Sequence, residues 1–280
     1  MISIVFGLAT AALFATSGLL NSRASKIIGS WSAVAWTMLV GLILTTPFIF
    51  IAGIPDGLGD SWPRLVVAGA GNVAGLVFVG LAFRVGKVGV VSPIVATEGA
   101  IAAVVAAILG ESILPIVAFL LFVIMVGVVV SAVAPDPEPL DHERPVISAL
   151  LATGSAVAFG LSLFASGSLS SDLPISWVLL PARIVGVVVL LIPLAATRNL
   201  RITRKTVPMV IGMGVAEVFG LTCFAIGAQY EVAITSVLAS QFAPISAVMA
   251  YFLFREKLGR LQITGVVILV AAVTSLTLVS

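Results

Sequence analysis

Stretches of about twenty apolar residues follow one another along almost the whole chain, and they restrict its fold more than any other feature. A helix of about 20 residues crosses the roughly 30 Å hydrocarbon core of a membrane and satisfies its own backbone hydrogen bonds there. We therefore predict an all-α integral membrane protein with ten transmembrane helices. The predicted spans are residues 3–21, 31–52, 63–83, 88–109, 113–134, 146–167, 175–196, 207–228, 233–254 and 260–279.

The composition excludes a soluble fold and several classes of function. Only 9% of the residues are charged, against about 25% in an average soluble domain. The net charge is +2 and the basic residues lie in short clusters, so we expect no nucleic-acid partner. One cysteine, Cys223, and one histidine, His142, are too few for most zinc sites and for Cys–His or Ser–His–Asp catalysis. We expect no cofactor.

A hydrophilic segment, residues 135–145 (PDPEPLDHERP), divides the chain into two halves that resemble each other. A shift of 145 residues pairs Phe14 with Phe159 and Ser17 with Ser162, and it also pairs Gly41 with Gly186, Gly69 with Gly214, Gly75 with Gly220 and Glu111 with Glu256. We therefore predict a five-helix repeat over 1–134, a linker over 135–145 and a second repeat over 146–280. Because five is odd, the second repeat would enter the membrane inverted. Inverted repeats are typical of transporters, whose substrate site lies near the midplane between the repeats.

Several short motifs resemble those of a known family. They are Gly110-Glu111, Phe254-Arg255-Glu256-Lys257-Leu258, Pro244 twelve residues before Glu256, and Pro181-Ala182-Arg183. With the five-plus-five pattern, they resemble the EamA-type members of the drug/metabolite transporter (DMT) superfamily, in which YddG-like amino-acid exporters are similar in architecture. The resemblance implies a secondary transporter and leaves its cargo open. The positions that match Pro244 and Arg183 in the first half hold Gly99 and Met38, which departs from a symmetric pattern.

Three ionisable residues lie inside predicted spans: Glu98, Arg183 and Glu217. A charged side chain at the centre of a membrane helix costs about 2.5–3.5 kcal/mol on insertion scales, so such residues usually face a cavity or one another. The two glutamates would bind an amine or exchange a proton, and Arg183 would balance them or bind a carboxylate. The alternative is a structural ion pair, or a neutral glutamate bonded to a neighbouring helix.

Six further residues are candidates for a substrate site. Asn72 occupies the position equivalent to Glu217, although it could instead bond across a tight helix contact. Gln241 is a weaker polar candidate in the ninth span. On the first helix of each repeat, Phe14 and Phe159 would line the cavity, or would face lipid or pack against other helices. Ser17 and Ser162 lie one turn further on the same helix face, which favours the cavity.

The positions of the basic residues predict an orientation in the membrane. Of the 14 lysines and arginines, twelve lie in or beside the odd-numbered loops. The positive-inside rule places those loops in the cytoplasm. We therefore expect a multi-pass protein of the cell inner membrane with both termini on the non-cytoplasmic side. We also expect a monomer in contact with membrane lipids, because both repeats lie in one chain.

Together these features predict a secondary transporter that moves a small polar metabolite, an amino acid or amine-like compound, by alternating access between inverted repeats. A drug or cation exporter is an alternative of the same kind. The alternative from another class is a polytopic enzyme acting on lipid-linked substrates, but it would need clustered acids, bases or metal ligands, and the sequence shows no such cluster. A channel would need a filter, and the sequence shows no filter-like segment. We therefore expect no enzyme activity. The segment Gly69–Ala74 (GAGNVA) fits a dinucleotide-binding pattern, but that pattern requires a preceding strand.

Overall fold

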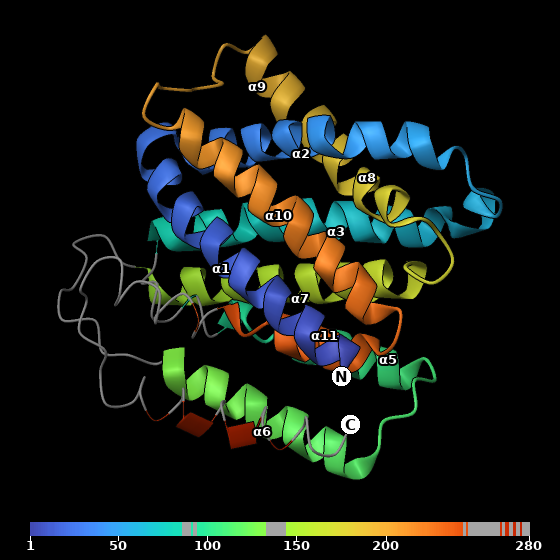
Figure 1. The fold of residues 1–280 in the computed structure, drawn as a ribbon. Helices are drawn as coiled ribbons and strands as arrows, with labels where there is room; N and C mark the ends of the chain where they lie inside the picture. Colours follow the sequence, from blue (N-terminus) through green and yellow to red (C-terminus); the bar gives the residue numbers. More distant parts are fainter. Residues whose placement is uncertain are drawn as a thin grey trace.

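The computed structural model describes residues 1–85, 91, 94–132 and 144–242, together with residues 245, 264, 267, 268, 271, 272 and 275. Every element in these ranges is helical (Figure 1). The helices are α1 (Ile2–Ile28), α2 (Ser30–Ala52), α3 (Leu58–Val85), α5 (Glu98–Ile108), α6 (Pro115–Ala132), α7 (Pro145–Leu169), α8 (Ile175–Gly186), the π-helical η1 (Val187–Leu191), α9 (Ile192–Ala196), α10 (Val207–Ala228) and α11 (Val232–Ala239).

Six helical segments in the described ranges are long and apolar enough to cross a membrane, and they agree with six of the predicted spans. They are Ile2–Ser25, Ser30–Ala52, Leu58–Val85, Val146–Leu169, Ile175–Ala196 and Val207–Ala228. The segment Ile175–Ala196 contains the π-helical turn η1 just before Pro193. Proline has no N–H to donate, so a wider turn before it is a common way to accommodate the missing bond.

Two predicted spans are interrupted, and the prediction of one unbroken helix for each is wrong. The span 88–109 has a turn at Ala96 and Thr97, after which α5 begins at Glu98. The span 233–254 begins as α11, which ends at Ala239 before a turn at Ser240 and Gln241. Gln241 follows Ala96 by 145 residues, so the two interruptions occupy equivalent positions of the halves. Most of the span 260–279, and the linker except Arg144 and Pro145, lie outside the described residues.

The helices connect at two opposite ends of the bundle. Figure 1 shows the α2–α3, α5–α6, α7–α8 and α10–α11 connections at one end, and the α1–α2 and α9–α10 connections at the other. Helices that match in sequence order run in opposite directions: α1 against α7, α2 against α8, and α3 against α10.

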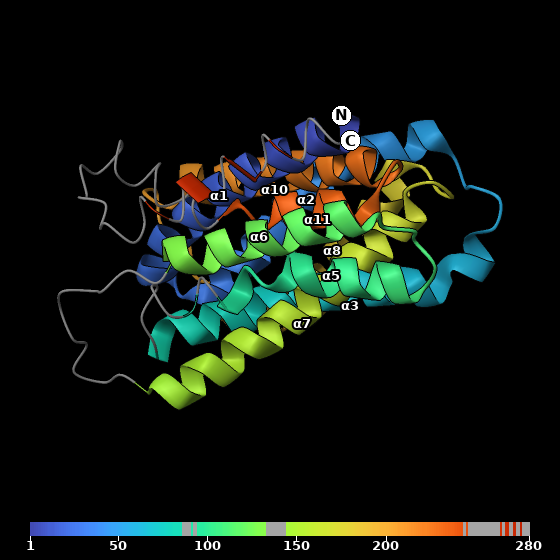
Figure 2. The ribbon, with the colours of Figure 1, turned by 90° about the horizontal axis from the view of Figure 1, so that it is seen from below.

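Two helix pairs pack side by side over most of their length, α3 with α7 and α1 with α10 (Figures 1 and 2). Glycines allow the close approach: a methyl group on Gly75 would lie 2.5 Å from the ring of Phe159, and one on Gly220 would lie 2.8 Å from the ring of Phe14. Phe14 and Phe159 therefore pack in helix contacts, which is the packing alternative of the sequence analysis.

Hydroxyl groups at equivalent positions of the two halves also contact these two glycines. The hydroxyl of Ser155 donates to the Gly75 carbonyl at 2.9 Å. The hydroxyl of Thr10 lies 3.2 Å from the Gly220 carbonyl and shares its proton between that oxygen and the Phe6 carbonyl of its own helix, at 2.8 Å. Ser155 follows Thr10 by 145 residues. A hydroxyl that bonds the backbone of a neighbouring helix helps to fix the register of a close helix pair, and a hydroxyl faces the same glycine position in both pairs.

Glu111 contacts the start of a helix that is distant in the sequence. The sequence places it just before α6, but its carboxylate accepts a hydrogen bond from the Ala233 N–H at 3.1 Å, at the start of α11. An anion at a helix N-terminus is favourable because the first N–H groups have no partner within the helix. Burial raises the pKa of the Glu111 carboxyl above its ordinary value, while the Ala233 bond opposes that rise.

The close helix contacts lead to a stability prediction. We expect Gly75→Ala to lower the free energy of unfolding by about 1–3 kcal/mol, because the added methyl overlaps the Phe159 ring in a packed interface. A methyl group on Gly18 would have no other atom within 4 Å, so Gly18→Ala is a matched control. Thermal melting of the protein in detergent measures both, and an equal melting temperature for the two variants would contradict the contact.

Candidate functional site

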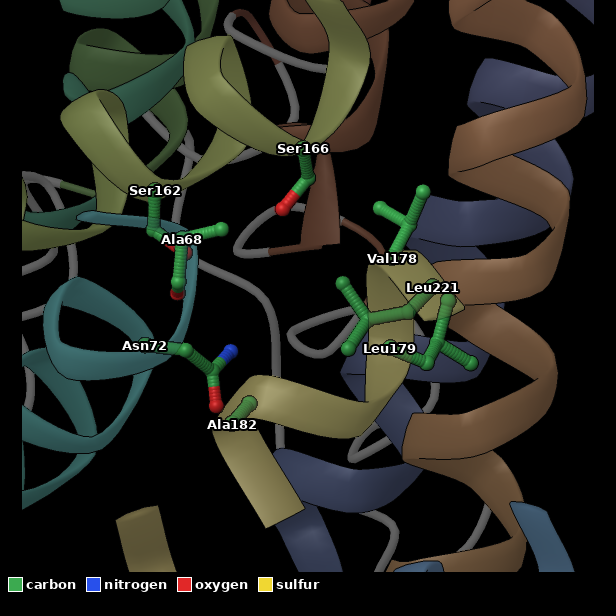
Figure 3. A pocket seen from close by; sticks show the side chains of 8 residues that line it. All are labelled: Ala68, Asn72, Ser162, Ser166, Val178, Leu179, Ala182 and Leu221. Carbon is green, nitrogen blue, oxygen red and sulfur yellow. The ribbon is translucent and has the colours of Figure 1, made fainter. Parts of the chain in front are cut away.

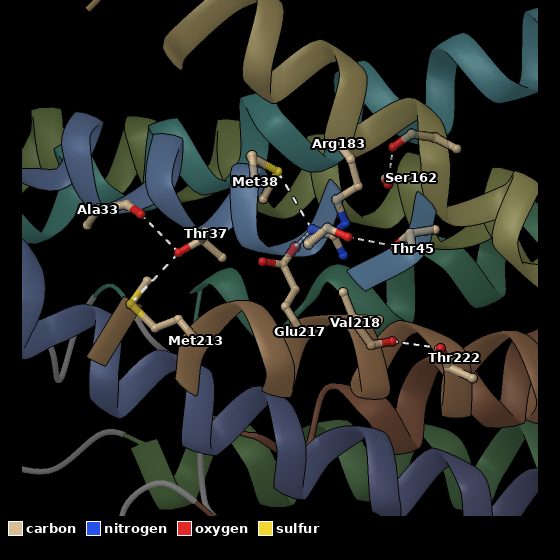
Figure 4. A network of polar contacts seen from close by, with 12 residues as sticks. Ala33, Thr37, Met38, Thr45, Ser162, Arg183, Met213, Glu217, Val218 and Thr222 are labelled. Carbon is tan, nitrogen blue, oxygen red and sulfur yellow. Dashed lines mark hydrogen bonds and ion pairs between the residues drawn. The ribbon is translucent and has the colours of Figure 1, made fainter. Parts of the chain in front are cut away.

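A buried ion pair joins α8 to α10. The Nη1 atom of Arg183 lies 3.0 Å from Oε1 of Glu217, and the two side chains are 0% and 7% exposed (Figure 4). The two residues lie far apart in the sequence and come together because α8 and α10 both pack against α2. The structure therefore brings together two of the three predicted ionisable residues as a pair.

Helix α2 completes the surroundings of Arg183. Nη1 also donates to the Met38 sulfur at 3.6 Å. A methyl group on Gly41, one turn further along α2, would lie 2.8 Å from both Cδ and Nε of Arg183. Only a glycine leaves room for the arginine stem at this point. Conversely, a methyl on Gly186 of α8 would overlap the Met38 side chain.

The contacts between α2 and α8 are made by residues at equivalent positions of the two halves. Arg183 follows Met38 by 145 residues, and Gly186 follows Gly41 by the same interval. Arg183 thus packs on Gly41 while Met38 packs on Gly186, and Arg183 and Met38 touch each other. Equivalent residues can touch only where the two halves meet, so Arg183 lies at that junction.

The guanidinium of Arg183 is only partly satisfied. Its Nε and Nη2 atoms are buried and have no hydrogen-bond partner in the described part of the chain. Two buried charged donors without acceptors are costly. Such groups in a native fold need a reason, for example an ordered water or a ligand that binds there.

A small cavity with one polar wall lies beside the ion pair. Its volume is about 10 Å³, roughly one water position. Asn72, Ser162 and Ser166 form its polar wall on α3 and α7; the other lining residues are Ala68, Val178, Leu179, Ala182 and Leu221 (Figure 3). The hydroxyl of Ser162 donates to the Ala68 carbonyl at 2.6 Å, and Asn72 Oδ1 is buried without a partner in the described residues.

The cavity and the ion pair are neighbours. Leu179 lies one helical turn before Arg183 on α8, and Leu221 lies one turn after Glu217 on α10. Figure 3 shows the Asn72 amide directed toward Ala182, the residue that precedes Arg183. Asn72, Ser162, Arg183 and Glu217 therefore belong to one region, which we call the central site.

Other predicted residues lie elsewhere. Glu98 is 4% exposed and starts α5, beside Gly99, where an added methyl group would overlap the Ser236 carbonyl and lie 2.8 Å from the Ser240 hydroxyl. Gln241, the residue after Ser240, is fully buried, and its Nε2 donates a hydrogen bond to the Val237 carbonyl at 2.9 Å. Glu98 and Gln241 thus mark a second polar region at the interrupted helices.

Ser17, another predicted site residue, is half-buried on α1 and does not line the cavity.

Ser166, Gly41 and Met38 are parts of the site that are absent from the predicted set. Ser166 follows Ser162 by one turn, so helical periodicity could have found it. Met38 was visible only as the position equivalent to Arg183. Among the described residues, no group of three or more His, Cys, Asp or Glu side chains could hold a metal ion.

Comparisons with known proteins identify the family. The model of the EamA-like transporter family matches twice, over residues 1–133 and 146–278. One similar solved structure is described only as the crystal structure of a protein. It has a TM-score of 0.78 and 16% sequence identity, and the match covers 99% of this chain and 96% of the chain in that structure. At that identity the likeness concerns the fold. No curated protein matches the sequence.

The chain belongs to the EamA-like transporter family, within the DMT superfamily. Transport across a membrane is therefore its class of activity, and enzymes are not characteristic of the family. The apolar helices described above agree with a multi-pass membrane protein. The predicted resemblance to this family is confirmed, while nothing in these comparisons distinguishes YddG-like exporters from other members.

The buried pair gives a prediction for stability. We expect Glu217→Gln to lower the free energy of unfolding by about 3–5 kcal/mol, because it leaves a buried guanidinium without a counter-charge. The exposed pair Arg64–Asp172, at 2.9 Å, provides the control. Asp172→Asn should cost at most about 1 kcal/mol, since water screens that pair. Chemical unfolding in mixed micelles compares them, and equal losses would contradict a special role for burial.

Proposed function

We propose that this chain is a secondary transporter of a small polar metabolite, an amino acid or amine-like compound, and that it works by alternating access. The observation that carries the proposal is the buried Arg183–Glu217 pair, which lies where equivalent residues of the two halves meet. Charges kept inside a membrane protein usually mark a substrate or ion pathway. No nucleotide-binding site is predicted from the sequence, so a gradient of substrate or ion would drive transport.

We propose further that the two halves are inverted five-helix repeats, residues 1–134 and 146–280, joined by the linker 135–145. Three observations support this division. The family matches each half separately, the equivalent helices run in opposite directions (Figure 1), and the Phe14–Gly220 contact recurs as Phe159–Gly75. Inverted repeats can exchange conformations about a shared site, which opens to one side at a time. One chain then supplies both repeats, and we propose a monomer.

The second polar region suits a supporting role in the same cycle. Interrupted helices near the midplane are a recurrent feature of transporter sites. Glu98 begins one half-helix and Gln241 follows another, and Gln241 Oε1 has no partner in the described part of the chain. Glu98 would bind a cationic group or exchange a proton there. A drug or cation exporter would use these same residues.

Transport assays test the function. We expect saturable counterflow of amino acids or amines in liposomes that contain the purified protein, whereas a non-saturating conductance would indicate a pore. Glu98→Gln and Glu217→Gln each replace an ionisable carboxyl group with an amide at nearly constant shape. If both variants insert normally and transport every substrate with the wild-type rate and pH profile, the assignment of these glutamates is wrong. Asp172→Asn serves as the control for loss of a carboxylate outside the site.

We also propose that the protein lies in the cell inner membrane with both termini on the non-cytoplasmic side. Support comes from the basic residues, twelve of 14 of which belong to the odd-numbered loops. The described connections of that set, α1–α2 and α9–α10, lie at the same end of the bundle (Figure 1).

The orientation is tested by labelling a cysteine introduced at the C-terminus. Cys223 is the natural cysteine, so Cys223→Ser provides the background for Ser280→Cys. We expect a membrane-impermeant maleimide added to intact cells, with the outer membrane made permeable, to label Ser280→Cys. Labelling only after the inner membrane is opened would reverse the proposed orientation.

A further inference from the structure

We infer that the connection between α9 and α10 binds the headgroup of an anionic phospholipid. We call this connection, residues 197–206 (TRNLRITRKT), the basic loop. It lies outside the central site, and the lipid would be a bound partner of the protein that differs from the cargo. Its place beside the membrane, its charge, its fixed backbone and its exposed apolar neighbours support this assignment.

The basic loop lies at the surface of the membrane, because it directly joins two membrane-spanning segments. The candidate span Ile175–Ala196 ends immediately before the loop, and Val207–Ala228 begins immediately after it. Figure 1 shows the loop at the end of the bundle where α1 is connected to α2. Its side chains are therefore within reach of lipid headgroups.

The basic loop has four cationic side chains and no acidic residue. The cationic residues are Arg198, Arg201, Arg204 and Lys205. All four are exposed, and none has an ion pair or a side-chain hydrogen bond within the described part of the chain. Clusters of four or more basic residues directly beside a membrane span are typical of binding sites for anionic lipids.

The described acidic residues are too far away to neutralise the basic loop. Apart from the buried Glu98 and Glu217, those in the described ranges lie in or beside the connections at the opposite end of the bundle (Figure 1); they are Asp56, Asp60, Glu111, Asp172 and Glu231. Helix α2 has 23 residues, so it separates the two ends by about 35 Å. Charges in water are screened over about 8 Å at physiological ionic strength, and the positive charge of the loop therefore stays uncompensated by these carboxylates.

Contacts with α2 hold the backbone of the basic loop in place. The indole Nε1 of Trp36 donates a hydrogen bond to the Arg201 carbonyl at 3.0 Å, and the Arg201 N–H donates to the Ser32 hydroxyl at 3.2 Å. Nearer to α10, the Thr203 N–H donates to the Thr206 hydroxyl at 3.0 Å. Because these bonds hold the backbone before a ligand arrives, binding requires less ordering of the chain.

Exposed apolar side chains beside the cations favour a lipid over a soluble anion. Ile202 follows Arg201 and is 44% exposed, and Trp31, next to Ser32 on α2, is 39% exposed. At a membrane interface such side chains contact the acyl region, while neighbouring arginines and lysines contact the phosphates. Inorganic phosphate would contact the cations only and would leave the apolar side chains in water.

The basic loop also joins the helices that hold the buried ion pair. Arg183 lies on α8, which leads through η1 and α9 into the loop, and Glu217 lies on α10, which follows the loop. Helix α2, to which Arg201 is bonded, packs against both α8 and α10. A ligand that binds only the folded state raises its stability, so we expect the lipid to stabilise this group of helices.

Quenching of tryptophan fluorescence by brominated lipids measures the lipid preference. Trp31 and Trp36 lie at the end of the basic loop, whereas Trp62 and Trp177 lie at the other end. The full chain with Trp62→Phe and Trp177→Phe is placed in phosphatidylcholine vesicles that contain brominated phosphatidylglycerol or brominated phosphatidylcholine. At low salt we expect phosphatidylglycerol to bind about 25-fold more tightly, the effect of two cations at about fivefold each. Equal affinities would overturn the inference, and the preference should decrease at about 1 M NaCl.

Matched double variants locate the site. Arg201→Gln with Arg204→Gln should lower the preference for phosphatidylglycerol by about tenfold or more, because two cations are lost. Arg84 and Arg144 lie at the same end of the bundle, where α3 ends and α7 begins. Arg84→Gln with Arg144→Gln removes the same charge outside the loop and should change the preference by less than about twofold. An equal decrease in both variants would indicate attraction to the whole basic end and would overturn the site.

Thermal melting of the unaltered protein gives a measurement that depends on no variant. In a neutral detergent, we expect phosphatidylglycerol to raise the melting temperature more than the same amount of phosphatidylcholine, and inorganic phosphate to leave it unchanged. Equal effects of the two lipids would overturn the inference. An equal rise with inorganic phosphate would assign the basic loop to a soluble anion and would overturn the assignment to a lipid.

Discussion

A guanidinium with no exposure to its surroundings is the constraint on which the centre of this structure depends. Arg183 requires a counter-charge, and Glu217 on α10 provides it at 3.0 Å. It also requires space, which Gly41 on α2 provides by having no side chain. One buried charge thus specifies the register of three helices, because a shift of one turn in any of them would separate the pair or overlap the arginine stem. Replacing buried pairs with apolar residues is often neutral or stabilising in other proteins, so stability alone does not explain the pair.

The rest of the bundle achieves close packing with little hydrophobic driving force. In a membrane, lipid tails are as apolar as leucine, so helices associate through close contact and hydrogen bonds. The α1–α10 and α3–α7 pairs use both: Phe14 and Phe159 pack on glycines, and Thr10 and Ser155 bond to the carbonyls of those same glycines. Packing of this kind is well suited to two alternative arrangements, because small residues let one helix slide against another.

Much of the fold could be predicted from hydropathy, and the exceptions have physical causes. The spans that became α2, α3 and α10 agree with the structure because apolar length alone decides them. The turn at Ser240 and Gln241 lies just before Pro244, and a proline disfavours helix in the turn that precedes it, so the sequence carried a signal there. The turn at Ala96 and Thr97 carried none in its own residues, because neither alanine nor threonine breaks a helix by propensity as proline does. Glu111 lies just before α6 in the sequence, yet its carboxylate binds the start of α11. Sequence shows which residue can cap a helix, but only the packing decides which helix end comes within reach.

The sequence by itself determined that this chain is built from apolar helices, that its halves share a pattern, and that very few charges remain inside. These follow from composition and periodicity, which depend on each segment's own environment. The tertiary structure alone decided that Arg183 pairs with Glu217 while Glu98 lies in a second region, and that Arg183 touches its own equivalent, Met38. A pairing depends on distances between helices, which no segment encodes alone. It arises only when glycine, methionine and arginine from different helices fill one space together.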